Sequence, residues 1–186
     1  VPSPDTVMTS DLIYWYSREF TTPGRSFELC RLKINKAKYH TRVFLNDRLV
    51  GENPYSFTPT ELDLTPYLNA PGEPNHLLIA VGCRNNLPPH VSDGHDFEKD
   101  FYYPGIYDDV HLIYSSAPYI QQVQCIPEIE EEQLRVQTSF WIGQEKGEYP
   151  LEYAVFELQG GRKVAAGSIA VNGTDADFRI EIPGCR

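Results

Sequence analysis

The sequence lacks the features by which three broad classes of protein are usually recognised. No apolar run approaches the ~18 residues that would indicate a membrane-spanning helix. Lysine and arginine total 16 against 26 acidic residues, a formal net charge of −10, which argues against nucleic acid or an anionic membrane surface as a partner. Helical periodicity extends over no long segment, so a helical domain is not indicated either.

The cysteines are few and widely spaced. The chain has four, Cys30, Cys83, Cys125 and Cys185, and none forms a CxxC pair, so the sequence indicates neither a zinc ribbon nor a dithiol redox centre. The first three each fall in an apolar, strand-like run, where we expect a buried thiol that acts as a small hydrophobe. The cysteines do not identify the cellular compartment.

What the sequence offers instead is a succession of short strand-like segments separated by turn residues. Strands are expected at 13–20, 26–35, 40–46, 48–51, 76–83, 106–114, 119–126, 133–142, 151–159, 162–171 and 177–182. Two turns are well marked, Gly160-Gly161 and Asn172-Gly173, the second being a favoured two-residue hairpin. With 41% hydrophobic and 12% aromatic residues the chain can fill a core. The pattern predicts an all-β protein built from sandwiches.

A series of short motifs follows in a fixed order along the first half of the chain. They are Asn46-Asp47, Val50-Gly51, Asp63-Leu64-Thr65, Asn75-His76-Leu77 and the segment 105–110, Gly-Ile-Tyr-Asp-Asp-Val. Thr65 before Pro66 also predicts a capped helical turn. Together the motifs closely resemble the N-terminal sugar-binding domain of glycoside hydrolase family 2, the family of β-galactosidases and β-glucuronidases. We expect the chain to turn at Asn46-Asp47 between the strands 40–46 and 48–51. Asp47 stands where that family has Gly, a mild change because Asp tolerates turns. Asp108 stands where it has Arg, so no family salt bridge is assumed there.

The resemblance implies two consecutive domains. Residues 1–116 would form a jelly-roll, galactose-binding-like β-sandwich, and residues 117–186 an immunoglobulin-like β-sandwich, with a polar break at 115–118. The second half has about five expected strands where a complete sandwich of this kind has about seven, so we expect it to be incomplete. The chain begins at Val1 without a signal-peptide pattern and stops where the family continues toward a catalytic barrel. We therefore expect an excised fragment.

Adjacent carboxylates in the chain do not indicate catalysis. Retaining glycoside hydrolysis needs two carboxyl groups about 5 Å apart. Asp108 and Asp109 are expected on opposite faces of a strand, and Glu130-Glu131-Glu132 in a solvated turn. In the family both catalytic carboxylates belong to the downstream barrel, so the resemblance implies that this fragment by itself hydrolyses nothing.

A polar loop at 90–96 raises the question of a metal. Its sequence, His-Val-Ser-Asp-Gly-His-Asp, gathers two imidazoles and two carboxylates, groups that can bind a transition metal. The spacing matches no strong metal signature, and an ordinary surface loop is the preferred interpretation. We predict no metal and no cofactor.

The resemblance points to Asp100 as the residue that contacts substrate. The segment 100–106, Asp-Phe-Tyr-Tyr-Pro-Gly-Ile, looks like the β-glucuronidase-type Asp-Phe-Phe-(x)n-Gly-Ile segment, one residue shorter. In that family the Asp reaches the mouth of the barrel and hydrogen-bonds substrate hydroxyls, a role that suits a carboxylate. The missing residue makes Lys99 the competing candidate. An Asp that caps loop amides is the alternative interpretation.

Aromatic and amide side chains near this segment could also contact a sugar. Tyr102 and Tyr103 could pack on the apolar face of a sugar ring or could simply fill space. The pair Tyr55 and Phe57 also invites the interpretation that a sugar packs on it. Asn85 and Asn86 could hydrogen-bond sugar hydroxyls or could be turn residues. The aromatic segment at 14–16 resembles the opening strand of the family, where aromatics fill the core, and we expect the same here.

The sequence therefore predicts the non-catalytic N-terminal region of a β-galactosidase-like, retaining glycoside hydrolase. It would buttress the catalytic barrel and contribute one wall of the substrate pocket. The predicted partner is a carbohydrate substrate, bound jointly with the missing barrel, and the full enzyme could form a homo-oligomer. The alternative is a free-standing carbohydrate-binding or cell-surface adhesion module, because a fold does not fix a function.

Overall fold

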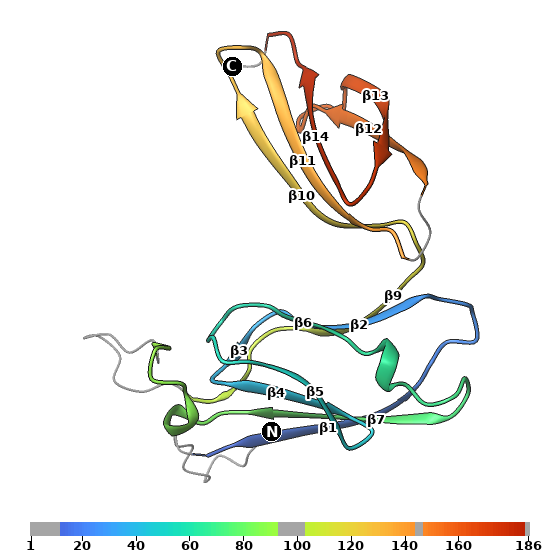
Figure 1. Ribbon diagram of the computed structural model, residues 1–186. Coiled ribbons are helices and arrows are strands. Elements are labelled where there is room, and N and C mark those ends of the chain that lie inside the picture. Colours follow the sequence, from blue (N-terminus) through green and yellow to red (C-terminus); the bar gives the residue numbers. More distant parts are fainter. Residues whose placement is uncertain (1–11, 93–102, 144–146, 185–186) are drawn as a thin grey trace. The chain divides into compact units, whose positions relative to one another are not determined.

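The computed structural model describes residues 12–92, 103–143 and 147–184, and nearly all its regular elements are β-strands. The chain divides into two compact units, Val1–Ser115 and Ser116–Arg186. Figure 1 shows the strands of each unit packed in layers. The predicted all-β, sandwich-type fold is confirmed. Within the described residues no helix has the length and apolarity needed to traverse a bilayer.

The first unit is a two-layer antiparallel sandwich. Its strands are β1 (Tyr14–Thr21), β2 (Leu29–Ile34), β3 (Ala37–Lys38), β4 (Thr41–Leu45), β5 (Arg48–Asn53), β6 (Thr60–Asp63), β7 (Pro74–Val81), β8 (Gly105–Ile106) and β9 (Val110–Ser115), with 3-10 turns η1 (Thr65–Tyr67) and η2 (Arg84–Asn86). One sheet has the order β1-β7-β4-β5, the other β6-β2-β9, and β3 pairs with β8 (Figure 1).

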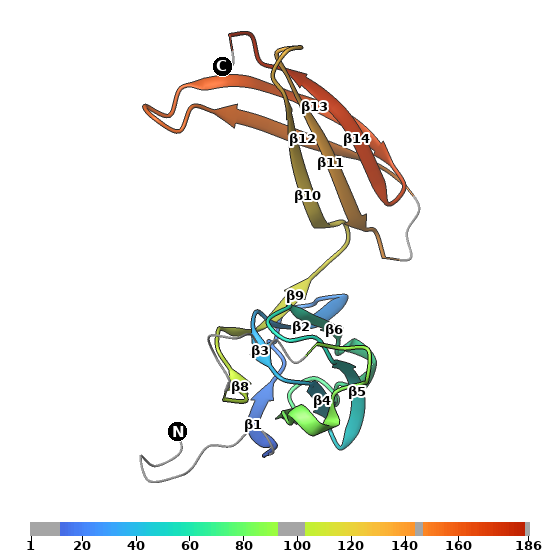
Figure 2. The same cartoon turned by 90° about the vertical axis from the view of Figure 1, so that its left-hand side faces the viewer.

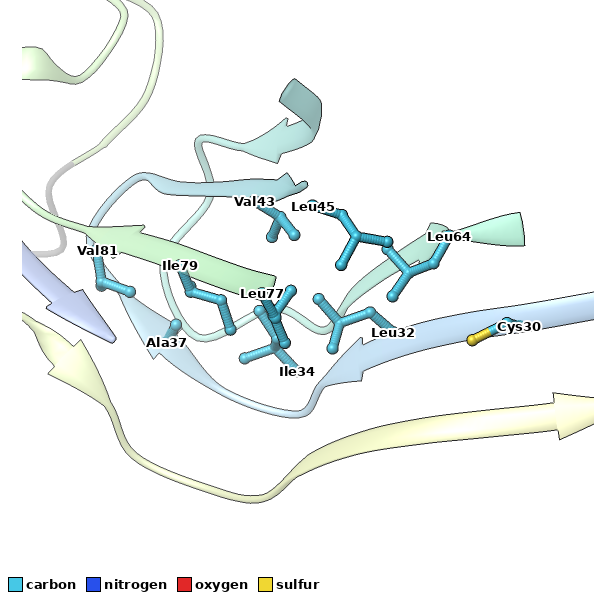
Figure 3. Packing of buried hydrophobic residues seen from close by; sticks show 10 residues of the cluster. All are labelled: Cys30, Leu32, Ile34, Ala37, Val43, Leu45, Leu64, Leu77, Ile79 and Val81. Atoms are coloured by element: carbon cyan, nitrogen blue, oxygen red, sulfur yellow. The ribbon is translucent and has the colours of Figure 1, made fainter. Parts of the chain in front are cut away.

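Alternation along the strands builds the core between these two sheets. On β2, β4 and β7 every second side chain points inward, because successive residues of a strand face opposite sides. Figure 3 shows the resulting cluster, which comprises Cys30, Leu32, Ile34, Ala37, Val43, Leu45, Leu64, Leu77, Ile79 and Val81. All of these residues are buried, and burial raises the pKa of the Cys30 thiol to about 11.

The hairpin between β4 and β5 forms at the turn that the sequence predicts. Leu45 pairs with Arg48, which leaves a two-residue loop at Asn46 and Asp47. Both loop residues have positive φ, 49° and 62°, as a type I′ hairpin turn requires. Asn and Asp tolerate this conformation, so Asp47 fits where the family has Gly.

A set of asparagine hydrogen bonds fastens this hairpin to η1 and β7. Asn75 is fully buried, and its Oδ1 accepts from Asn46 Nδ2 at 2.9 Å and from the Asn69 amide at 2.8 Å. Asn46 Nδ2 also donates to the Tyr67 carbonyl at 2.9 Å, and Asn46 Oδ1 accepts from the His76 amide at 2.9 Å. We call this set the asparagine lock. It satisfies polar groups that would otherwise be buried at a cost in stability.

The turn η1 forms, but not with the predicted cap. The residue before it is Leu64, and no side chain caps the turn. Thr65 is its first residue, and Thr65 Oγ1 accepts a hydrogen bond from the Cys30 amide at 2.9 Å. The hydroxyl therefore ties η1 to β2. The Thr65 amide instead donates to Asp63 Oδ1 at 2.8 Å, so the expectation of an N-cap at Thr65 was wrong.

The prediction that the aromatic segment 14–16 fills the core was also wrong. Trp15 is 54% exposed and lies on the outer face of its sheet, in contact with Phe44 at a ring-centroid separation of 6.2 Å. Tyr16 is also exposed, and its hydroxyl accepts a hydrogen bond from the Ile106 amide at 3.3 Å. The reason is position in the sheet: β1 is an edge strand, so only one neighbouring strand covers it.

The second unit contains two further sheets. Its strands are β10 (Tyr119–Glu128), β11 (Gln133–Trp141), β12 (Glu148–Phe156), β13 (Lys163–Asn172) and β14 (Asp175–Glu181). They form the sheets β10-β11-β14 and β12-β13 (Figure 2), joined by ring contact between Tyr153 and Phe178. Gly160-Gly161 lies in the turn of the β12–β13 hairpin, as predicted. The turn at Asn172-Gly173 is not a hairpin, because β13 and β14 belong to different sheets.

One of the three thiols predicted to be buried is exposed. Cys30 and Cys83 are buried, whereas Cys125 on β10 is exposed, contrary to the sequence-based expectation. Its neighbour Val123, on the same side of the strand, is 53% exposed. Because β10 is an edge strand, side chains that alternation directs inward still meet solvent there.

Charged side chains cross the outer face of the β10-β11-β14 sheet. Arg135 Nε donates to Asp177 Oδ1 and Gln137 Nε2 to Asp177 Oδ2, both at 2.9 Å. Arg179 Nε donates to Glu128 Oε2 at 2.7 Å. Hydrogen bonds from Arg135 and then from Gln137 hold the pKa of Asp177 well below its usual range.

This depressed pKa predicts how the second unit responds to acid. A group whose pKa is lower in the folded state contributes stability that is present above its unfolded pKa, about 4 for aspartate, and is lost as pH falls through the folded value. We expect Asp177→Asn to lower stability at neutral pH and to flatten its decline below about pH 4. Urea unfolding at several pH values, followed by Trp141 fluorescence in a Trp15→Phe background, measures this.

The control for this prediction is Glu181→Gln, which removes one carboxylate charge from the exposed end of the same strand. It should leave the slope of stability against pH closer to that of the unmodified protein. If Asp177→Asn and the unmodified protein lose stability in parallel below about pH 4, the hydrogen-bonded carboxylate has no such role.

Candidate functional site

The predicted site residues divide between described and undescribed parts of the chain. Tyr103, Asn85 and Asn86 are described, and all three are exposed. Asp100 and Tyr102, together with the competing Lys99, fall at 93–102, outside the described residues. The same holds for most of the polar loop at 90–96.

The backbone brings the two flanks of segment 93–102 to the same end of the sandwich. Gly82, just after β7, has φ +107°, and a Cβ built there would lie 2.5 Å from the Leu12 carbonyl oxygen and 3.2 Å from Pro104 Cβ. The chain that leaves β7 therefore passes against the chain that enters β8. The turn η2, with Asn85 and Asn86, follows Gly82, and Tyr103 precedes Pro104. Only a glycine permits both this φ and this approach.

The short β3–β8 pair forms the floor of this end. Lys38 pairs with Gly105, and the Tyr107 amide donates to the Lys36 carbonyl at 2.9 Å. The Lys38 side chain is fully buried, and its ammonium lies 4.8 Å from the centroid of the Tyr39 ring and 5.2 Å from that of Phe57. Both distances are within the range of cation–π attraction.

The loop between β5 and β6 presents Phe57 above this floor. Asn53 Nδ2 donates to Thr58 Oγ1 at 3.1 Å and to Thr60 Oγ1 at 3.0 Å, while Asn53 Oδ1 accepts from the Tyr55 amide at 3.0 Å. The Phe57 amide donates to the carbonyl of residue 37 at 2.8 Å. The Asn53 side chain thus holds the loop to the end of β5, and the Phe57 amide holds it to β3.

Four exposed aromatic residues gather around β8. We call Tyr16, Phe57, Tyr103 and Tyr107 the aromatic cluster. The rings of Phe57 and Tyr107 meet edge to face, with centroids 5.6 Å apart, and Tyr107 Oη donates to the Tyr103 carbonyl. Burial, with Tyr16 and Tyr103 nearby, raises the pKa of Tyr107 above its ordinary value. Of this cluster the sequence pointed to Tyr103 and Phe57. It placed Tyr16 in the core, and it included Tyr107 only in the family motif at 105–110 and not among the site residues.

The adjacent carboxylates of the chain lie outside its strands. Asp108 and Asp109 lie in the connection between β8 and β9 and not inside a strand as expected; both are exposed, and the Asp109 amide donates to Asp108 Oδ1 at 2.7 Å. The acidic run at 130–132 lies in the exposed turn between β10 and β11, as predicted. Among the described residues no three His, Cys, Asp or Glu side chains group so as to hold a metal.

Of two hollows of nearly equal volume, the one beside β1 includes Tyr16 of the aromatic cluster in its lining. One, of about 480 Å³, has a polar lining on the β10-β11-β14 sheet that includes Gln122, Gln137 and Asp177. The other, of about 470 Å³, lies beside β1 and has a mainly apolar lining that includes Phe20 and Leu112. The described lining of neither contains Tyr103, Asn85 or Asn86. Within the described residues the candidate site is therefore an open surface at one end of the first unit.

The first unit is thus an antiparallel β-sandwich that displays aromatic rings and amide side chains at one end. The chain is a member of glycosyl hydrolases family 2, whose sugar binding domain matches residues 2–116. The family resemblance drawn from the motifs is thereby confirmed.

Individual relatives are longer proteins. The chain is 23% identical to the β-glucuronidase of Mus musculus, over 91% of this chain but only 28% of that protein. It is 33% identical to the β-galactosidase large subunit of Latilactobacillus sakei, over 52% of this chain and 14% of that one. The chain therefore spans less than a third of the curated relatives it matches.

Solved structures share the fold. A family 2 glycosyl hydrolase from Bacteroides cellulosilyticus superposes with a TM-score of 0.75 at 16% identity, covering 98% of this chain and 26% of that one. Bacteroides uniformis β-glucuronidase 2, in a structure covalently bound to cyclophellitol-6-carboxylate aziridine, gives a TM-score of 0.72 at 22% identity, covering 94% and 22%.

Proposed function

We propose that this chain is the non-catalytic N-terminal region of a family 2 glycoside hydrolase. It buttresses the catalytic barrel and contributes one wall of the substrate pocket, so its ligand is a carbohydrate that it binds jointly with the barrel. The observation that supports this most directly is the meeting of the two flanks of segment 93–102 at Gly82. That meeting gathers Asn85, Asn86 and Tyr103 at the end from which the segment departs.

Asp100 is the lead contact in this proposal. A carboxylate accepts hydrogen bonds from two hydroxyls on adjacent sugar carbons, and the charge makes each bond stronger than a neutral one. Tyr102 and Tyr103 follow it two and three positions later in the chain, and Asn85 and Asn86 offer both donors and acceptors. The wall would thus supply polar contacts at its centre and aromatic surface beside them.

The test is Asp100→Asn in the full-length enzyme that contains this chain. The variant keeps the shape and loses the charge, so we expect kcat/KM to fall about tenfold to a hundredfold, through a higher KM or a lower kcat. The melting temperature should stay the same. Steady-state kinetics on a chromogenic glycoside measures the effect.

Lys99→Met is the companion variant, because Lys99 is the competing residue. Unchanged kinetics for Asp100→Asn would reject the assignment, and a loss confined to Lys99→Met would transfer the contact to that residue. Tight binding of a free glycan by this chain alone would favour the free-standing carbohydrate-binding module instead.

A further inference from the structure

Phe57 has a backbone conformation that its side chain does not favour. Its φ is +60°, in the left-handed region. Asn46 and Asp47 share this region, but they are the residue types that tolerate it, whereas a bulky aromatic residue there is an outlier. Strained residues of this kind persist when the surrounding structure fixes them, and they concentrate at functional sites.

The surroundings of Phe57 fix it from several directions. Its amide donates to the carbonyl of residue 37, and its loop is tied down by the Asn53 side chain. The buried ammonium of Lys38 lies 5.2 Å from the ring centroid, and Tyr107 meets the ring edge to face. The hydrogen bond from Tyr107 Oη to the Tyr103 carbonyl orients the second ring in turn.

The ring held in this way is not used to fill the core. Phe57 remains 40% exposed and Tyr107 49% exposed. An aromatic residue that served packing alone would gain most by full burial. A rigid, exposed aromatic pair is instead suited to binding, because little conformational freedom is left to lose when a ligand packs on it.

We propose that Phe57, held by the edge-to-face contact with Tyr107, forms an aromatic platform on which a pyranose ring of the substrate packs its C–H face. This rests on the proposed function, because the platform lies on the same surface as Tyr103, at the end where segment 93–102 departs. Asp100 would bind hydroxyls, while the platform binds the apolar face of a sugar and so selects for rings that present one.

The experiment uses the full-length enzyme with Phe57→Leu and Phe57→Tyr. A platform binds the ground state and the transition state alike, so Phe57→Leu should raise KM about threefold to tenfold with kcat changed less than about twofold. Phe57→Tyr keeps the aromatic ring and should keep KM near that of the unmodified enzyme. Steady-state kinetics on an unbranched pyranoside gives both constants.

Phe57→Gly separates binding from structure. Glycine adopts φ +60° without strain, so this variant should melt no lower than Phe57→Leu and still show the raised KM. If Phe57→Gly lowers the melting temperature further than Phe57→Leu and leaves KM unchanged, the ring serves packing only and the platform is overturned.

The matched control is Phe156→Leu in the second unit. Phe156 is also an exposed phenylalanine, with Lys163 Nζ 5.7 Å from its ring centroid, and its replacement should leave KM unchanged. A KM for Phe156→Leu raised as much as that for Phe57→Leu would overturn the platform. Asp100→Asn and Lys99→Met complete the set: a loss in either with normal Phe57→Leu kinetics rejects the platform alone, and normal kinetics in all three variants rejects the proposed function as well.

Discussion

Gly82→Ala is expected to destabilise the first unit by about 3 kcal/mol. About half of this loss comes from a φ of +107°, which an alanine does not readily adopt, and the rest from the new methyl group, which would meet the Leu12 carbonyl oxygen at 2.5 Å. Carbonyl oxygen belongs to the backbone, so the chain itself would have to shift. Urea unfolding measures the loss through Trp15 fluorescence in a Trp141→Phe background, because each unit holds one of the two tryptophans.

Gly72→Ala is the matched control for this prediction. Gly72 also has a positive φ, +87°, but no heavy atom lies within 4 Å of the position its Cβ would take. Replacing Gly72 with alanine should therefore lower the free energy of unfolding only because of the positive φ, by about 1–2 kcal/mol. Equal losses in the two variants would show that the close approach of the chain at Gly82 has no energetic weight.

Asn75→Ala is expected to lower the free energy of unfolding of the first unit by a similar amount, about 3 kcal/mol. The substitution removes the fully buried oxygen that accepts from Asn46 Nδ2 and from the Asn69 amide. The Asn69 amide then loses its acceptor, and Asn46 Nδ2 keeps only its bond to the Tyr67 carbonyl. It also leaves a small cavity. The same fluorescence-detected unfolding of the first unit measures the effect.

Asn86→Ala serves as the control for the asparagine lock, because Asn86 is exposed at the other end of β7. Asn86→Ala should lower the free energy of unfolding by no more than about 0.5 kcal/mol. A comparably small loss for Asn75→Ala would mean that water replaces the missing oxygen, and the asparagine lock would then contribute little to stability.

The sequence predicts those parts of the fold that depend on local rules. The hairpin at Asn46-Asp47 and the core strands follow from turn chemistry and alternation, and the structure has both. The strands β3 and β8 could not be predicted, because two residues carry no periodicity and their pairing joins positions about seventy apart in the chain. The exposure of Trp15 was not predicted, because the resemblance to the family's opening strand does not show that Trp15 lies on the outer face of an edge strand.

The candidate site was only partly predictable for the same reason. Family motifs drew attention to Tyr103, Asn85 and Asn86, which the fold places at one end of the first unit. The orientation of Phe57 depends on long-range contacts with Lys38 and Tyr107, and these exist only after β3 and β8 have paired. No local pattern encodes such a contact.

The asparagine lock and the aromatic cluster lie at opposite ends of β4. The lock begins at Asn46, just after the strand, and the floor beneath Phe57 lies at Lys38, just before it. Five extended residues, about 16 Å, separate the two. Randomising Phe57 and Tyr107 in a directed-evolution library would thus leave the asparagine lock untouched, so altered sugar preference could be selected with this contribution to stability intact.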